Sequence, residues 1–499
     1  MRERTLEQKK TLTRQHMNTH NIVKNIALCA MATLSLSACD LLEPSDIVNP
    51  NVDEDTFKNT PNAVETWING TNSTFATTIG EFAELTEILS DNYFNNSSQG
   101  SKVFDYPTLL YTDPDVTNLQ RAIGTIREMA LNGLNNISQA NQGMTQEQEF
   151  NLRYIEGYSY LLAGEYFVGL PEENGGDVKD WKDNLNKAIE TFDQCLTLAK
   201  ADTTKAFVNT LLARAYYKLG DKQNAVTYAN KALSQSSDFV KQVKFDGKNG
   251  VDNSFQGFIY GNPYGTSYQP LPRLDFLDPK YFQTTDQLEQ RPICIAKAEE
   301  PYLITAEAEI ADNNLDKAKQ TMSKLLKLVK SRPIQKGIND QLEQRGGGGY
   351  KDYPDSSSYK VAASADDSLR AGLVLDRKKP HLIDIPYISG TSVSESMISQ
   401  CDTQDDLLQL LYLMRQEIFF GEGRRAADLG IRLPLCEVEA ANTHADAYTK
   451  AQIPSFIPQN QDMDTFTMDK EKMTVVIKYN MNKVIVENKN SEYVAPFFN

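Results

Sequence analysis

Residues 205–234 hold the stretch that decides the fold. It reads Leu211-Leu-Ala-Arg-Ala-Tyr-Tyr-Lys-Leu-Gly220-Asp-Lys-Gln-Asn-Ala225-Val-Thr-Tyr-Ala-Asn-Lys-Ala232. Small alanines at helix crossings let two antiparallel helices approach closely, while larger Leu and Tyr side chains fill the adjoining spaces. Gly220 suits the tight turn between the two helices. The stretch therefore predicts a closely packed helical hairpin.

Similar spacing recurs along the chain and is typical of tetratricopeptide repeats. Residues 300–330 form a second, looser copy. Residues 147–200 form a third candidate, for which a plain helical hairpin is the alternative, because a loop at 170–176 separates its two helices. Further helices are predicted at 62–75, 81–89 and 116–140. The fold class is mainly α, a tetratricopeptide-like superhelix with long irregular loops and a small C-terminal β-hairpin.

Two irregular stretches interrupt this pattern. Residues 241–290 and 334–499 carry many aromatics among Gly, Pro and Asn, and long loops of this kind are usually functional or disordered. A strong amphipathic helix is predicted inside the second stretch, at 405–420. A final hairpin is predicted from 474–479 and 483–487. We expect one domain over 62–499, with its helical scaffold at 62–240 and 291–333.

The amino terminus has the layout of an export signal. An uncharged apolar run from Ile26 to Leu36 follows Lys24 and ends in Leu36-Ser-Ala-Cys39, the pattern of a bacterial lipobox. We expect a signal peptide over 1–38, for which Met17 is an alternative start, acylation of Cys39, and an extended leader over 39–61. An ordinary cleaved signal followed by a chance Cys is the alternative. The run is shorter than the roughly 20 apolar residues that a spanning helix needs.

Charge limits the partners of this chain. The formal net charge is −16, and removal of residues 1–38 leaves 45 basic and 65 acidic groups. Such a surface repels phosphate backbones, so nucleic acid is not an expected partner. No Cys pair has zinc-ligand spacing, and we expect no metal and no cofactor. Four cysteines outside the signal and lipobox are either disulfide-bonded or small buried side chains, the second being preferred; they are Cys195, Cys294, Cys401 and Cys436.

Five landmarks occur in one order along the chain. They are the lipobox with its acidic leader, Leu89-Ser-Asp-Asn92, Leu152-Arg-Tyr-Ile-Glu-Gly-Tyr158, Tyr302-Leu-Ile-Thr-Ala-Glu-Ala-Glu309, and Arg415-Gln-Glu-Ile-Phe-Phe-Gly-Glu-Gly-Arg-Arg-Ala-Ala-Asp-Leu429. Together they resemble the SusD/RagB family of outer-membrane nutrient-binding lipoproteins. Two departures mark a divergent member: Gly169-Leu-Pro171 lacks the family's Asp, and Ala426 and Ala427 replace bulkier residues.

The resemblance implies a fold, a place and a partner. It implies four tetratricopeptide units that support a looped half. It also implies a lipid-anchored protein on the outer membrane that faces the cell exterior and docks on a TonB-dependent, SusC-like barrel transporter. The cargo that it implies is oligosaccharide or, in the RagB branch, peptide. The expected function is therefore capture of oligosaccharide, less readily of peptide, and its delivery to that transporter, without catalysis.

Aromatic rings in loops are the expected ligand contacts, because Tyr offers a flat face at low conformational cost. Three clusters are candidates: Tyr260, Tyr264 and Tyr268 first, then Tyr93, Phe94 and Asn95, then Tyr350 and Tyr353. The alternative for each ring is packing against the helical half.

Charged residues around the last long helix are expected to form a structural ion-pair network. They are Arg415, Glu417, Glu422, Arg424, Arg425 and Asp428. A catalytic role is disfavoured, because Arg does not exchange protons near neutral pH. We predict no catalytic residue. Two other functions remain open: a lipid-anchored glycoside hydrolase, since carboxylates are abundant, and a tetratricopeptide scaffold for envelope assembly.

Overall fold

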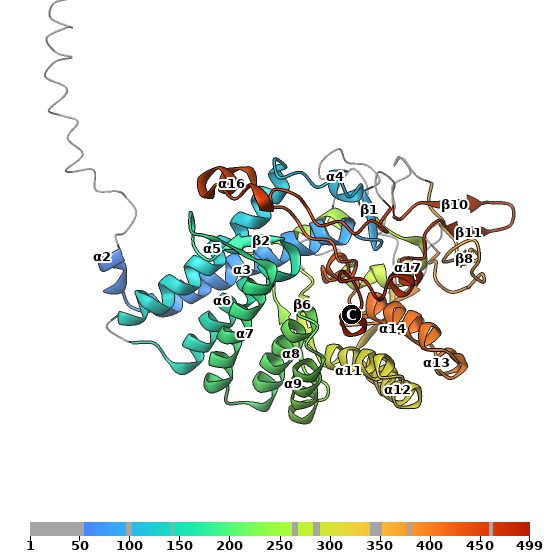
Figure 1. Ribbon diagram of the computed structural model, residues 1–499, viewed down its shortest axis with the longest axis horizontal. Helices are drawn as coiled ribbons and strands as arrows, with labels where there is room; N and C mark the ends of the chain where they lie inside the picture. Colours follow the sequence, from blue (N-terminus) through green and yellow to red (C-terminus); the bar gives the residue numbers. More distant parts are fainter. Residues whose placement is uncertain are drawn as a thin grey trace, which may run out of the picture. The chain divides into compact units, whose positions relative to one another are not determined.

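Packed helix pairs form the scaffold of the chain after residue 60 (Figure 1). The computed structural model describes residues 54–95, 102–140, 143–261, 268–282, 290–339, 352–376, 382–458 and 463–499. The chain divides into a unit of residues 1–60, whose described part holds the short helix α2 (Glu54–Lys58), and a unit of residues 61–499.

The predicted repeat at 205–234 is a helical hairpin. Helix α8 (Asp202–Lys218) packs on α9 (Lys222–Gln235), and Ala213 and Ala225 are completely buried. Gly220 makes the turn in the left-handed region at φ +76°, where a side chain would be strained. Asp221 then caps α9 by accepting a hydrogen bond from the Asn224 N–H at 3.0 Å.

The other two predicted copies are also helix pairs. They are α11 (Glu299–Ala311) with α12 (Leu315–Ser331), and α6 (Gln146–Tyr166) with α7 (Trp181–Leu198). Helices α6 and α7 approach closely because α6 carries glycines at the crossing. A Cβ on Gly157 would lie 2.6 Å from Phe192, and one on Gly164 would lie 2.5 Å from Leu185. The fold class predicted from the sequence, a mainly helical tetratricopeptide-like scaffold, is confirmed.

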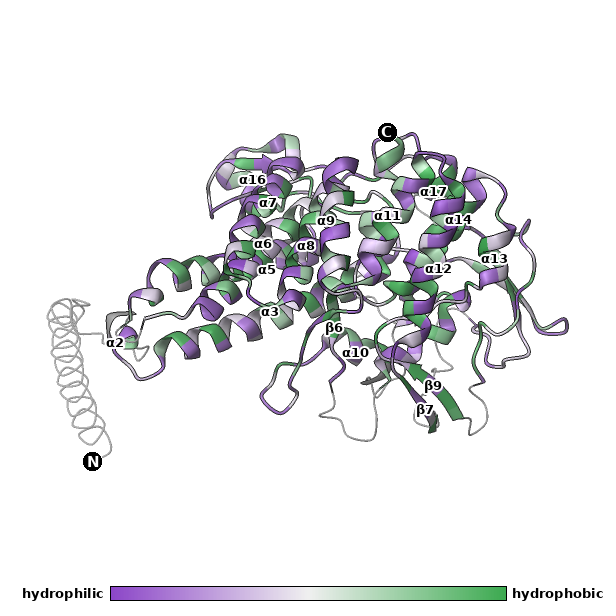
Figure 2. Cartoon of the chain, turned by 90° about the horizontal axis from the view of Figure 1, so that it is seen from below, coloured by the Kyte–Doolittle hydropathy of each residue, from purple (hydrophilic) through white to green (hydrophobic). Residues whose placement is uncertain are grey.

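Two further helices lie on the amino-terminal side of these pairs. The expected helix at 116–140 is α5 (Pro114–Asn135) followed by the short turn η3 (Ile137–Gln139). The prediction of two helices at 62–75 and 81–89 is wrong, because α3 (Ala63–Ile88) runs through both. Ala76 and Ile79 are buried and continue the apolar face between them. Figure 2 shows hydrophobic and hydrophilic residues alternating along the scaffold helices, as expected for helices with one buried face.

Short strands and turns make up the irregular half. The two-stranded sheets pair β1 (Tyr93–Asn95) with β5 (Tyr268–Pro270), β2 (Gly169–Pro171) with β3 (Val178–Asp180), β4 (Val240–Val243) with β6 (Ile293–Lys297), and β7 (Ile334–Asn339) with β9 (Leu382–Pro386). A three-stranded sheet has the order β10 (Phe466–Asp469), β11 (Thr474–Ile477), β8 (Lys360–Ala362). The remaining short helices are α4 (Lys102–Asp105), α10 (Ser254–Gln256), the π-helical turn η4 (Gly257–Gly261), η5 (Pro272–Tyr281), α13 (Glu395–Gln400), α15 (Arg425–Asp428), α16 (Glu437–Thr443) and η7 (Asp446–Tyr448).

Much of the stretch 241–290, predicted as loop, is core. Phe255, Leu271, Leu274 and Tyr281 are completely buried. Of the aromatic side chains that suggested an exposed functional loop, Phe255, Tyr268 and Tyr281 are instead buried, and the rings of Phe255 and Tyr281 meet at 5.2 Å between centroids. Burial of an apolar side chain lowers the free energy of the folded chain whether its backbone belongs to a helix, a strand or an irregular segment.

The predicted final hairpin is half right. Residues 474–477 form β11, but its hairpin partner is β10, and residues 483–487 belong to helix α17 (Met481–Glu487). Asn480 caps this helix, and Ile485 and Met481 share its buried face. The amphipathic helix expected at 405–420 is α14 (Gln404–Ile418), which packs on α17.

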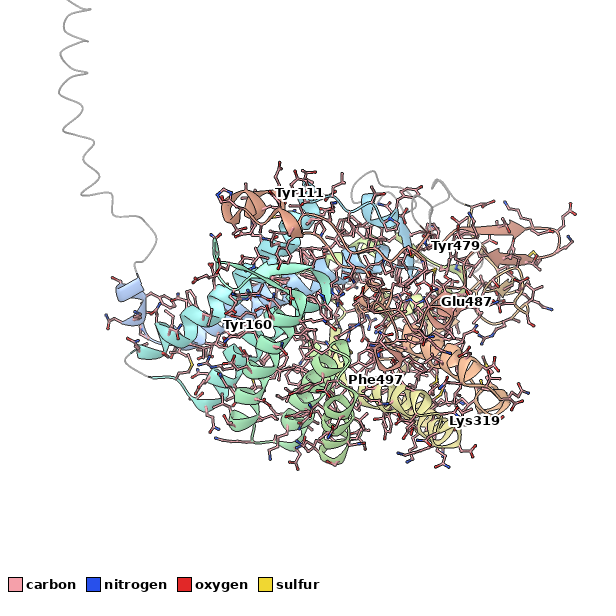
Figure 3. The ribbon with its side chains drawn as sticks, viewed as in Figure 1. Tyr111, Tyr160, Lys319, Tyr479, Glu487 and Phe497 are labelled. Atoms are coloured by element: carbon pink, nitrogen blue, oxygen red, sulfur yellow. The ribbon has the colours of Figure 1, made fainter. Side chains whose placement is uncertain are left out.

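The carboxyl terminus returns to the helical scaffold. The short helix η8 (Pro496–Phe498) contacts α8 and α11, and the ring of Phe497 meets that of Tyr217 edge-on with centroids 5.1 Å apart (Figure 3). Cys195, Cys294, Cys401 and Cys436 are free thiols, so they are not joined by disulfides. Within the described ranges, no helix combines the length and hydrophobicity that a membrane crossing requires.

Candidate functional site

Residues from all three predicted aromatic clusters meet in the irregular half. Strands β1 and β5 pair antiparallel, so that Asn95 lies opposite Tyr268 and Tyr93 lies opposite Pro270. The ring of Tyr353 lies 6.2 Å, centroid to centroid, from the ring of Phe94. Segments that are about 175 to 260 residues apart in the sequence therefore share one location, which the sequence alone did not indicate.

The described rings at this location are packed in the core. Tyr93 is completely buried; its ring stacks on Phe420 at 4.9 Å and meets Phe255 edge-on at 5.2 Å. Its hydroxyl donates a hydrogen bond to Asp278 Oδ1 at 2.9 Å. Tyr268 stacks on Phe258 at 4.9 Å. In this conformation these rings stabilise the fold and have almost no surface to offer a ligand.

The other predicted contacts differ in exposure. Phe94 and Asn95 are buried, and the Asn95 N–H donates to Asp105 Oδ1 at 2.9 Å. Tyr353 is partly exposed and its hydroxyl donates to Asp275 Oδ1 at 3.2 Å. Tyr260 has its backbone in η4, but its side chain, like Tyr264, Tyr350 and the lipidation site Cys39, lies outside the described residues. Ligand contact by the three clusters remains a prediction.

A buried carboxylate anchors the β1–β5 pair to the rest of the molecule. Asp91, just before β1, accepts hydrogen bonds from Arg425 Nε at 2.6 Å and from Arg273 Nη2 at 3.1 Å. Gln416 Nε2 donates to the same carboxylate at 3.0 Å. Burial opposes ionisation of Asp91, but the charges of Arg425 and Arg273 outweigh it and hold its pKa below the usual range.

The charged motif around α14 lies in this same buried region. Arg415 Nε donates to Asp428 Oδ2 at 2.7 Å, and Lys218 lies 3.2 Å from the same carboxylate. Arg424 lies 2.9 Å from Glu300, which also binds Arg214 at 2.6 Å.

Two glutamates complete the motif in different ways. Glu422 lies 2.6 Å from Lys297 and 2.5 Å from Lys280. Glu417 instead accepts hydrogen bonds from the Ser392 N–H and the Thr391 hydroxyl, both at 2.7 Å. Five of the six predicted motif residues therefore lie in ion pairs, while Glu417 accepts hydrogen bonds from the uncharged groups of Thr391 and Ser392.

Sequence reasoning did not identify the partners of this motif. Lys297 ends the apolar strand β6, and an isolated Lys in a buried strand indicates a paired charge, so this signal was available. Arg273 and Arg214 carry no comparable signal, because their acidic partners are distant in sequence: 182 residues for Arg273 and Asp91, and 86 for Arg214 and Glu300.

Buried carboxyl groups dominate the titration of this region. Burial raises the pKa of Glu87 to about 7, although hydrogen bonds from Asn92 and the Gly423 N–H lower it. Burial likewise raises the pKa of Glu307 to about 7, although the charge of Arg415 and the Tyr217 hydroxyl lower it. These groups face protein partners. Within the described part of the chain, no cluster of three or more His, Cys, Asp or Glu could hold a metal ion.

Comparison with known proteins agrees with this architecture. A tetratricopeptide repeat model matches residues 208–239, which fall mostly in α8 and α9. A search of curated proteins finds no significant match.

Similar solved structures come from Bacteroides. A SusD superfamily protein from Bacteroides vulgatus has 14% identity and a TM-score of 0.51, covering 80% of this chain and 100% of its own. A SusD-like carbohydrate binding protein from the same organism has 14% identity and a TM-score of 0.48, and the match covers 73% of this chain and 82% of that protein. NanU from Bacteroides fragilis has 13% identity and a TM-score of 0.47, and the match covers 82% of this chain and 96% of that protein. At such identities the likeness concerns the backbone alone, and the match to the first of these proteins, at a TM-score of 0.51, gives the chain the fold of that SusD superfamily protein.

Proposed function

We propose that this chain is a cell-surface lipoprotein that captures oligosaccharide and delivers it to a TonB-dependent, SusC-like barrel transporter in the outer membrane. Peptide is the second choice of cargo. The observation that carries the proposal is the fold, which matches a SusD superfamily protein over that protein's full length. The five ordered sequence motifs support the same assignment.

The arrangement of the irregular half supports a binding role. The ends of β1 and β5 meet at Asn95 and Tyr268, the residues that adjoin 96–101 and 262–267 in the sequence. Two buried contacts of Asp91 hold the start of β1 in place: an ion pair with Arg425 of α15 and a hydrogen bond from Gln416 of α14. Rigid attachment of ligand-contacting residues lowers the ordering cost of binding. Tyr264 and the other predicted rings remain our candidates for ligand contact.

A first test measures retention of soluble polysaccharides in native gels. We expect Tyr264→Ala to weaken retention of the bound glycan at least several-fold, because a sugar packs against the flat face of an aromatic ring and alanine has no such face. Tyr111→Ala is the matched control, since Tyr111 is 37% exposed and lies outside the predicted clusters. Equal retention by the two variants would remove Tyr264 from the site.

A second test addresses the transporter. The native complex is purified through this chain from detergent-solubilised outer membrane, and co-purifying proteins are identified by mass spectrometry. We expect a β-barrel transporter in near-stoichiometric amount. Recovery of the lipoprotein alone under conditions that keep other envelope complexes intact would count against delivery to a transporter.

A third test separates binding from hydrolysis. The purified chain is incubated with each glycan that it retains, and reducing ends are measured over a day. We expect none above the buffer control, because the proposed mechanism makes and breaks no covalent bond. Release of reducing ends that depends on a single Asp or Glu would instead identify a glycoside hydrolase.

A further inference from the structure

A cavity of about 240 Å³ lies where the carboxyl-terminal segment, marked C in Figure 1, meets the start of α7 and the end of α8. Its walls include Trp181, Lys182, Lys218, Arg432 and Tyr493, and no residue of the three predicted aromatic clusters lines it. We propose that this C-terminal cavity binds the carboxylate group of a small ligand, and that Arg432 is the group that pairs with it.

Arg432 is a buried arginine without a counter-ion in the described part of the chain. It is 8% exposed, its Nε donates to the Gly164 carbonyl at 3.4 Å, and its guanidinium lies 3.9 Å from the centroid of the Trp181 ring. The charges of Glu165 and Asp180 act on it, but no acidic group of the described residues lies within 4 Å of it. Buried charges in proteins are normally paired, so this guanidinium lacks an expected anion.

Arg127 shows how a buried guanidinium is satisfied inside the same chain. Burial lowers the pKa of Arg127 and that of Arg432 to about 10. Arg127 donates to the Ser159 hydroxyl at 3.0 Å and to the carbonyls of Pro171 and Glu172 at 2.7 and 3.1 Å. The single long hydrogen bond of Arg432 does not replace its lost hydration in this way, so an anion that reaches Arg432 is stabilised there.

The terminal nitrogens of Arg432 remain accessible. Nη1 and Nη2 make no hydrogen bond to the described residues, and neither of them is among the unpaired atoms that are sealed from solvent. The planar fork of a guanidinium matches the two oxygens of a carboxylate. Lys218 also lines the cavity; its Nζ donates to Ala427 O at 3.1 Å and to Asp428 Oδ1 at 3.2 Å, which leaves one of its three N–H groups for a ligand.

The charge and the size of the cavity favour a single carboxylate. Of the two acidic side chains in its wall, Asp428 is bound by Arg415 at 2.7 Å and by Lys218, while Glu492 is exposed and its charge is screened by water. One unpaired guanidinium therefore suits one negative charge better than the two charges of a phosphate. The volume lies below the roughly 300–1,000 Å³ of drug-sized sites, so the ligand is small.

Calorimetry on the purified chain at pH 7 tests the site with four probes. Glucuronate and alanyl-alanine carry a carboxylate, glucose is the neutral analogue of glucuronate, and inorganic phosphate is the competing anion. We expect at least one carboxylate probe to bind, at least tenfold more tightly than glucose and phosphate. Which of the two binds distinguishes an acidic sugar from a peptide as the source of the carboxylate.

Variants assign the binding to Arg432. Arg432→Gln removes the positive charge, and we expect it to weaken carboxylate binding at least tenfold. Arg121→Gln is the matched control, because Arg121 is exposed and lies outside the cavity, and we expect it to bind as the wild-type chain does. Should Arg432→Gln fail to fold, judged by its melting temperature, Lys182→Glu reverses an exposed charge in the cavity wall and is expected to weaken binding several-fold.

Three results would overturn the proposal. They are the absence of carboxylate binding by the wild-type chain, tighter binding of glucose or phosphate than of both carboxylates, and carboxylate binding that the folded Arg432→Gln or Lys182→Glu variant leaves unchanged.

Discussion

At the scale of single residues, Asp91 connects four helical elements of the scaffold and the irregular half. It follows α3, and its carboxylate binds Arg273 of η5, Gln416 of α14 and Arg425 of α15. All four side chains are almost fully buried. Removing one partner of a buried ion pair leaves a desolvated charge without compensation, which costs far more than losing an exposed pair.

The first prediction concerns Asp91→Asn. It leaves Arg425 and Arg273 without their anion, so we expect the free energy of unfolding in urea to fall by about 3–5 kcal/mol. The control is Glu190→Gln, which breaks the exposed pair with Lys187 at 3.0 Å and is expected to cost less than about 1 kcal/mol. Similar losses in the two variants would show that the Asp91 contacts contribute little.

The second prediction concerns pH and Glu307, whose pKa in the folded chain is raised to about 7 mainly by burial. A carboxyl with a raised pKa binds more protons in the folded state, so its contribution to stability is complete below the unfolded pKa and is lost as the pH rises to about 7. Glu307→Gln stays neutral throughout. We therefore expect its unfolding free energy, relative to wild type, to increase between pH 5 and pH 8 by an amount on the order of 1–3 kcal/mol.

Urea titrations of both proteins across this pH range check that prediction. Glu190→Gln again serves as the control, because the side chain of Glu190 is largely exposed. A relative stability of Glu307→Gln that stays constant from pH 5 to pH 8 would contradict a raised pKa at this site.

At the scale of elements, close helix crossings depend on residues without bulky side chains. A Cβ on Gly164 of α6 would lie 2.8 Å from the Trp181 carbonyl oxygen, which belongs to the backbone and cannot move aside easily. By contrast, a Cβ on Gly124 of α5 would meet nothing within 4 Å. Both glycines lie inside helices, so they differ mainly in what surrounds them.

The third prediction compares these two positions. We expect Gly164→Ala to lower the unfolding free energy by about 1–3 kcal/mol through overpacking of α6 against α7. Gly124→Ala is expected to raise it by about 0.5–1 kcal/mol, because alanine has the higher helix propensity. Thermal and urea unfolding measure both, and a stabilising Gly164→Ala would refute close α6–α7 packing.

Helix α17 shows where an element cannot be assigned from its sequence alone. Val484 and Val486 alternate with Lys483 and Ile485, which suggested a strand. The segment is helical because Asn480 caps it and its buried residues lie one turn apart against α14. A seven-residue segment with a short apolar run at Val484–Val486 fits either period, and its neighbours decide between them.

At the scale of the whole molecule, the proposed function needs a membrane tether as well as a binding face. The fourth prediction is that Cys39→Ala abolishes acylation, seen in mass spectrometry as a chain without fatty-acid mass. Cys401→Ala is the control, since Cys401 is a partly exposed free thiol, and it is expected to keep the fatty-acid mass. Fatty-acid mass on Cys39→Ala equal to that on the wild-type chain would contradict a lipid anchor at this residue.

The sequence by itself determined the helical scaffold, since the alanine spacing around Gly220 and the apolar period of α14 are local properties that the structure retains. The motif at 415–429 likewise pointed to a charged network. Only the tertiary structure decided which aromatics are buried and which charges meet: Asp91 and Arg425 are 334 residues apart. Burial and ion pairing depend on which distant segments pack together, and a local sequence pattern does not specify those segments. For this reason the sequence indicated Tyr93 and Tyr268 as loop residues, although both lie in the core.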